Sequence, residues 1–309
     1  MLSSKIEKDT FMQKSLLKHS MILLCAAFFW GITFVAQDIG AAFVGPFTYL
    51  TFRSYLGTAI LLPIIYRNYK KKIKEGTAPT KKERNASVKT HLMAGVLCGI
   101  CLFFSSFTQQ FGIAYTTVAK ASFITALYVV LVPVFSLFLG KKAPVRVWIC
   151  VAICTLGLYF LCIDGELKLA FGDTIILICA VLFAIHILVV NHFNPVTDGL
   201  TLSASQFFVT AILATVCMVI WEPIEPGMLI KALPSIAFAG IFSNAIAYTC
   251  QIIGQKGVRP AVASLIMCLE SVFGTLAGWI VLHQTLTLRE ILGCCLMFAA
   301  IVMVEMGEA

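Results

Sequence analysis

Ten long apolar segments follow one another along this chain and dominate what it can fold into. A helix needs about 20 mostly apolar residues to cross a bilayer. Only 12% of the 309 residues are charged and 60% are hydrophobic, whereas a soluble domain carries about 25% charged residues. The sequence therefore predicts an all-α integral membrane protein with ten transmembrane helices, at residues 19–37, 43–66, 91–114, 118–139, 144–162, 171–191, 202–221, 233–254, 260–282 and 287–305.

The basic residues predict the orientation of these helices. Of 23 Lys and Arg residues, eighteen lie in a tail at 1–18, in a basic loop at 67–90, and near 141–146 and 256–259. Four lie in the connections on the opposite side, and Arg53 lies within a helix. Because cytoplasmic loops carry the excess of positive charge, we expect both termini in the cytoplasm of a cell (inner) membrane. The same clustering next to apolar segments indicates lipid bilayer, and not nucleic acid, as the partner of the basic residues.

Cysteine usage predicts neither a metal nor a cofactor. Most of the 12 cysteines lie inside apolar segments, where a thiol acts as a small apolar side chain. Cys98 and Cys101 form a CxxC pair, but no second pair of Cys or His stands at metal-ligand spacing. We therefore expect no metal site and no cofactor.

The two halves of the sequence resemble each other at two fixed shifts. The first two segments match the sixth and seventh at a shift of 153, which pairs Thr48 with Thr201 and Arg53 with Gln206. The third and fourth match the eighth and ninth at a shift of 142, which pairs Gln109 with Gln251, Gly112 with Gly254, Ser122 with Ser264 and Leu127 with Leu269. Because each half has five helices, an odd number, the second half must enter from the opposite face. The sequence predicts two inverted five-helix repeats, at 19–162 and 171–305, an arrangement typical of secondary transporters.

Two ionisable residues lie deep within apolar segments, where charge is costly and is a candidate for function. Arg53 lies about ten residues into the second segment, and Glu270 lies halfway along the ninth. One interpretation is that Arg53 attracts an anionic group of a solute, while Glu270 attracts a cation or carries a coupling proton. The alternative is a structural role, as an ion pair or as polar anchors between helices.

Uncharged polar residues form stripes on several helices, and such faces turn away from lipid. Together with the two charges they predict a central polar cavity. Trp30 lies at mid-depth in the first helix, and His186 aligns with Thr33 at the 153 shift, although a packed histidine is the other interpretation. The candidate substrate-binding residues are Trp30, Thr33, Arg53, Gln109, Tyr128, His186, Asn244, Tyr248, Gln251 and Glu270, with Glu270 the candidate for coupling.

Several short motifs resemble the EamA family of the drug/metabolite transporter (DMT) superfamily. They are Phe29-Trp30-Gly31, Arg53 in the second helix, Pro133-Val134-Phe135, and Leu269-Glu270-Ser271-Val272-Phe273, in which Ser271 replaces a proline of the family pattern. The resemblance covers both repeats. It implies ten helices, a cavity between helices 1–4 and 6–9, and a permease or exporter of amino acids, related metabolites or toxic compounds. The missing proline at Ser271 implies a straighter ninth helix, whereas Pro133 should bend the fourth.

We therefore expect a secondary transporter that moves a small organic metabolite by alternating access. A channel or uncoupled facilitator is the main alternative. An intramembrane enzyme is disfavoured because His186, His192 and His283 have no catalytic partner at usable spacing. The sequence leaves open the identity of the solute and whether the chain acts alone or as a homodimer.

Overall fold

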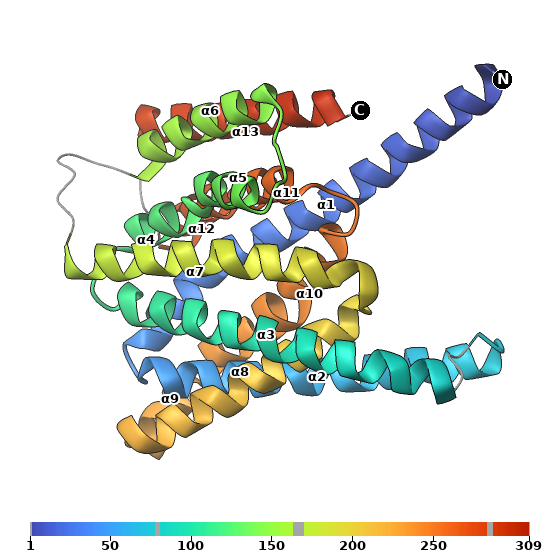
Figure 1. Ribbon diagram of the computed structural model, residues 1–309. Helices are drawn as coiled ribbons and strands as arrows, with labels where there is room; N and C mark the ends of the chain where they lie inside the picture. Colours follow the sequence, from blue (N-terminus) through green and yellow to red (C-terminus); the bar gives the residue numbers. More distant parts are fainter. Residues whose placement is uncertain (1, 78–80, 163–169, 283–286, 309) are drawn as a thin grey trace.

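The computed structural model describes residues 2–77, 81–162, 170–282 and 287–308, and these contain helices and no strands. Figure 1 shows the helices arranged as a bundle, with α6 and α13 side by side along one edge. The helices are α1 (Leu2–Ala41), α2 (Pro46–Lys74), α3 (Lys81–Ile113), α4 (Val118–Ala126), α5 (Tyr128–Phe138), α6 (Val145–Cys162), α7 (Phe171–Phe193), η1 (Asn194–Val196), α8 (Gly199–Trp221), α9 (Pro226–Phe238), η2 (Ala239–Ala247), α10 (Tyr248–Gly254), α11 (Pro260–Met267), α12 (Glu270–Leu282) and α13 (Leu288–Glu308).

Seven segments of the described chain are helical, long and apolar enough to cross a membrane. The helix Val145–Phe160 is apolar but shorter. The protein is thus an all-helical, multi-pass membrane protein. The seven segments are Ser15–Ala41, Val88–Ile113, Lys120–Phe138, Phe171–Val196, Gly199–Trp221, Pro226–Gly254 and Pro260–Val281.

The expected basic loop at 67–90 is largely helical, which corrects the prediction. α2 continues to Lys74 because neither Gly nor Pro follows Pro63 in this helix. It ends just before Gly76, whose positive φ of 68° is the backbone conformation that commonly terminates a helix. α3 then begins at Lys81, and the expected tail at 1–18 likewise belongs to α1 from Leu2 onward. Residues 1 and 78–80 of these two segments lie outside the described chain.

Two membrane segments are interrupted near their middle. One interruption separates α4 from α5 at Leu127, and the other separates α11 from α12 at Cys268–Leu269. Pro133 lies inside α5, six residues after the interruption at Leu127. The ninth helix, which was expected to be straighter, is instead interrupted at Cys268–Leu269. Ser271 instead uses its hydroxyl to donate a hydrogen bond to the Ser122 carbonyl oxygen at 3.1 Å.

The segment Pro226–Gly254 contains nine residues of π-helix, η2, between two α-helical parts. A π-helix holds more residues per turn than an α-helix and often marks a functional site. The sequence predicts the start of this helix at residue 233, but α9 already begins at Pro226, and Pro234 lies inside it.

Candidate functional site

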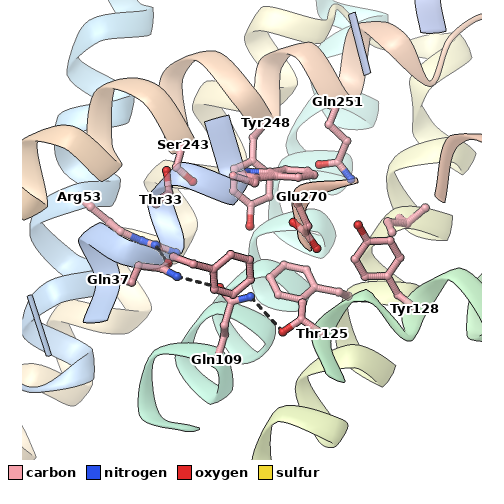
Figure 2. A pocket seen from close by; sticks show the side chains of 14 residues that line it. Thr33, Gln37, Arg53, Gln109, Thr125, Tyr128, Ser243, Tyr248, Gln251 and Glu270 are labelled. Atoms are coloured by element: carbon pink, nitrogen blue, oxygen red, sulfur yellow. Dashed lines mark hydrogen bonds between the residues drawn. The ribbon is translucent and has the colours of Figure 1, made fainter. Parts of the chain in front are cut away.

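A buried cavity lies where the interrupted helices, the π-helix and α1 meet. Its volume is about 30 Å³, room for about two water molecules. Figure 2 shows the polar side chains converging on it from several helices. The lining residues are Trp30, Thr33, Phe34, Gln37, Arg53, Gln109, Thr125, Tyr128, Phe183, Ile187, Ser243, Tyr248, Gln251 and Glu270.

The helix interruptions position two of these side chains. Tyr128 is the first residue of α5 and Glu270 is the first residue of α12. Each residue therefore follows directly on an interruption, and the two are related by the shift of 142. A carboxylate in the first turn of a helix is stabilised by the positive end of the helix dipole. In Figure 2 the hydroxyl of Tyr128 points towards Glu270.

A chain of hydrogen bonds runs along one wall of the cavity (Figure 2). Arg53 Nη1 donates to Gln37 Oε1 at 2.5 Å. Gln37 Nε2 donates to Gln109 Oε1 at 3.3 Å, and Gln109 Nε2 donates to Thr125 Oγ1 at 3.4 Å. These hydrogen bonds connect α2, α1, α3 and α4.

Arg53 and Glu270 are buried, with 2% and 4% of their surfaces exposed. No ion pair joins them, and within the described chain Glu270 Oε1 and Arg53 Nε have no hydrogen-bond partner. The structure therefore does not contain the fixed Arg53–Glu270 ion pair that was one interpretation of the sequence.

Aromatic side chains form the rest of the wall. The Trp30 and Tyr248 rings meet edge to face, with centroids 4.8 Å apart. Phe34 and Phe183 add apolar surface. The cavity thus offers one cationic group, one carboxyl group, several amides and hydroxyls, and aromatic faces, which together suit an amphipathic solute.

The structure brings eight of the ten candidate residues to this cavity and places two elsewhere. His186 is fully buried behind Tyr248, where its Nε2 lies 3.1 Å from Gln206 Oε1. Asn244 lies on the π-helix and packs closely against α2. A Cβ atom added at Gly57 of α2 would lie 2.7 Å from the Cβ atom of Asn244. Neither residue lines the cavity. Whether the ten residues bind a solute stays a prediction.

Sequence reasoning missed several lining residues. Gln37 lies four residues after Thr33 and seven after Trp30, so the helical spacing contained the signal. Thr125 belongs to a polar stripe with Ser122. Phe34, Phe183 and Ile187 carried no signal, because apolar residues on a membrane helix face lipid as readily as a cavity.

Known proteins resemble this chain over most of its length. The model of the EamA-like transporter family matches residues 17–163 and again 170–306. An uncharacterized transporter of Archaeoglobus fulgidus is 26% identical over 285 residues, which cover 92% of this chain and 84% of that protein. The uncharacterized transporter YoaV of Bacillus subtilis is 22% identical over 298 residues, covering 93% of this chain and 97% of that protein. One crystal structure, 18% identical, matches with a TM-score of 0.72 over 93% of this chain and 96% of its own, and so supports the fold alone.

Proposed function

The chain belongs to the EamA-like transporter family and is a membrane transporter, and we propose that it carries a small amphipathic organic solute across the cell membrane by alternating access at the central cavity. The observation that carries this proposal is that Arg53 and Glu270 line the same buried, aromatic-walled cavity and form no ion pair with each other. A solute with an anionic and a cationic group, such as an amino acid or a related metabolite, would satisfy both.

The proposal includes ten spans in two inverted repeats, at 19–162 and 171–305, with both termini in the cytoplasm. Matching contacts support the inversion. A Cβ atom at Gly172 would come within 2.6 Å of the Tyr115 carbonyl oxygen, and one at Gly257 would come within 2.5 Å of His19 Nδ1. Gly172 and His19 are 153 positions apart, and Gly257 and Tyr115 are 142 apart. The contact of Gly172 with Tyr115 and the contact of His19 with Gly257 are therefore equivalent under the repeat, with the two halves exchanged.

The π-helix fits the same symmetry. A Cβ atom at Gly99 would lie 2.6 Å from Val209 Cβ, and one at Gly240 would lie 3.0 Å from Leu56 Cβ. Leu56 and Val209 are 153 apart, but Gly99 and Gly240 are 141 apart, one fewer than the shift of 142 at Gln109 and Gln251. η2 lies at this place, and its wider turns accommodate one additional residue.

The size of the cavity supports a carrier that changes conformation. A volume of about 30 Å³ is far below the several hundred Å³ of a typical small-molecule site. A solute can therefore bind only if the surrounding helices separate. Movement of one repeat against the other around a fixed central site is the way inverted-repeat transporters open to each side in turn.

A thermal-shift screen of the purified protein in detergent tests the proposed class of solute. A solute that binds the folded state raises the melting temperature as its concentration rises. We expect amino acids and related zwitterions to raise it in the wild-type protein and, at the same concentration, to raise it less in Arg53→Gln and Glu270→Gln. Shifts given only by neutral apolar compounds, unchanged in both variants, would refute the proposed class.

A further inference from the structure

Two carboxylates of the second repeat hold the first repeat at one end of the bundle. This far end lies away from the two chain termini in Figure 1 and contains the starts of α2 and α7 and the end of α8. The carboxylates belong to Glu222, directly after α8, and Asp173, in the first turn of α7. Both make contacts that cross from one repeat to the other.

Glu222 caps the N-terminus of α2. Its Oε1 accepts a hydrogen bond from the Phe47 N–H at 2.9 Å, and its Oε2 accepts from the Thr48 N–H and the Thr48 hydroxyl, both at 2.7 Å. Gly45 allows this approach, because a Cβ atom there would lie 2.3 Å from the carboxyl carbon of Glu222. We call these contacts the Glu222 latch. They are charge-assisted bonds to a helix N-terminus, the stronger class of hydrogen bond.

Asp173 binds residues at the connection between α3 and α4. Its Oδ1 accepts from the Thr116 hydroxyl at 2.5 Å, and its Oδ2 lies 3.7 Å from Lys120 Nζ. The Asp173 Oδ2 also accepts from the N–H of Ala170, directly before α7, at 3.0 Å. We call the contacts with Thr116 and Lys120 the Asp173 latch.

The sequence does not repeat these charges at the opposite end. The shift of 153 places Ser20 opposite Asp173, and the shift of 142 places Val258 opposite Thr116 and Val262 opposite Lys120. The N-terminus of α8, which corresponds to that of α2, is capped from within its own repeat by Asp198, which accepts from the Thr201 N–H at 3.0 Å. Neither latch is therefore repeated at the residues that correspond to it at the opposite end.

We propose that the Glu222 and Asp173 latches form a paired gate that keeps the far end closed and releases as a unit when that end opens. This inference rests on the proposed alternating access. The two latches grip different parts of the first repeat, α2 and the α3–α4 connection, so separation of the repeats at this end must break both. Glu222 is only half-buried and Lys120 is partly exposed, so water can replace these bonds when the gate opens.

Hydrogen–deuterium exchange on the full-length protein in lipid nanodiscs tests the paired gate. Asp173→Asn should accelerate exchange at Phe47 and Thr48 in the other latch by roughly tenfold, the factor expected for loss of one hydrogen bond to a charged group. Glu222→Gln should likewise accelerate exchange in residues 114–121. Thr116→Val and Thr48→Val remove one donor from each latch and repeat the test with a smaller perturbation.

The controls are two carboxylates whose side chains do not bond across the repeats, one at the opposite end of α8 and one near Glu222. Asp198→Asn removes a cap within the second repeat, and Glu225→Gln removes a charge from the same connection as Glu222, where its side chain caps nothing. Neither should change exchange in the distant latch. Acceleration confined to the latch that carries the substitution would overturn the paired gate. Coupled exchange in a protein that fails to transport would keep the gate and remove the proposed function.

Discussion

Arg53 and Glu270, a cationic and a carboxyl side chain, line the same buried cavity, yet no ion pair joins them. Two buried charges that pair with each other would occupy the cavity themselves and leave little for a ligand to satisfy. Because the two side chains do not pair with each other, a solute with an anionic and a cationic group can pair with both of them when it binds. The separation of these side chains is the basis of the predictions that concern transport.

The first prediction concerns Arg53. Arg53→Gln should weaken binding of a solute with a carboxylate by about tenfold or more, because one hydrogen bond to a charged group contributes about 1.5–3 kcal/mol. The same solute as its methyl ester should bind both proteins alike, which isolates the carboxylate. Titration calorimetry on the purified proteins measures both affinities. An equal loss for acid and ester would assign Arg53 to positioning of Gln37 instead.

The second prediction concerns Glu270. Glu270→Gln keeps the size of the side chain and removes the proton that the carboxyl group can exchange. Accumulation of solute driven by a proton gradient should fall to the level of passive exchange, while exchange of solute for solute persists. Glu290→Gln, which alters a partly exposed carboxylate at the start of α13, is the matched control. Gradient-driven accumulation that survives Glu270→Gln would exclude Glu270 from coupling.

The third prediction concerns the contact between α1 and α12. A Cβ atom at Gly31 would lie 2.6 Å from the Glu270 carbonyl oxygen and 2.7 Å from the Gly274 nitrogen, both backbone atoms. Gly31→Ala should therefore destabilise the protein by about 1–3 kcal/mol, as overpacking commonly does. Gly227→Ala, at a position with open space around it, should have little effect. Melting curves of the two variants in one detergent provide the comparison.

The fourth prediction concerns the inverted topology. Alkaline phosphatase fused after Glu225, between α8 and α9, should be active, because this connection is expected on the outer side of the membrane. The same enzyme fused at either terminus should be inactive, since both termini are expected in the cytoplasm. Activity at a terminus would contradict the orientation. Inactivity after Glu225 would contradict the number of spans that precede it.

Much of the fold could be predicted from the sequence, because lipid imposes long apolar segments on the whole chain. The polar identity of Gln109 with Gln251 also identified two walls of the cavity. The interruptions at Leu127 and Cys268–Leu269 were not predicted, because neither position carries Gly or Pro and packing against other helices determines them. The only sequence sign of η2 is that the shift between the repeats changes from 141 at Gly99 and Gly240 to 142 at Gln109 and Gln251. A single shift of 142 does not reveal this change.

The latches were also beyond sequence reasoning. Glu222 and Thr48 are 174 positions apart, and a carboxylate at the end of a helix has no pattern that specifies its partner. Asp173 is an acidic residue in the first turn of a helix, a common pattern that predicts where the helix starts. This pattern does not predict the contacts of Asp173 with Thr116 and Lys120. Contacts between distant elements depend on how the repeats pack, which composition and periodicity do not specify.

Solute counterflow in proteoliposomes is the direct test of alternating access at the cavity. Vesicles loaded with unlabelled solute from the thermal-shift screen receive a trace of labelled solute outside. Alternating access predicts transient, saturable uptake of label that requires internal solute and is lost in Arg53→Gln but not in Gly227→Ala. Linear uptake that neither saturates nor responds to internal solute would indicate a channel and would contradict alternating access.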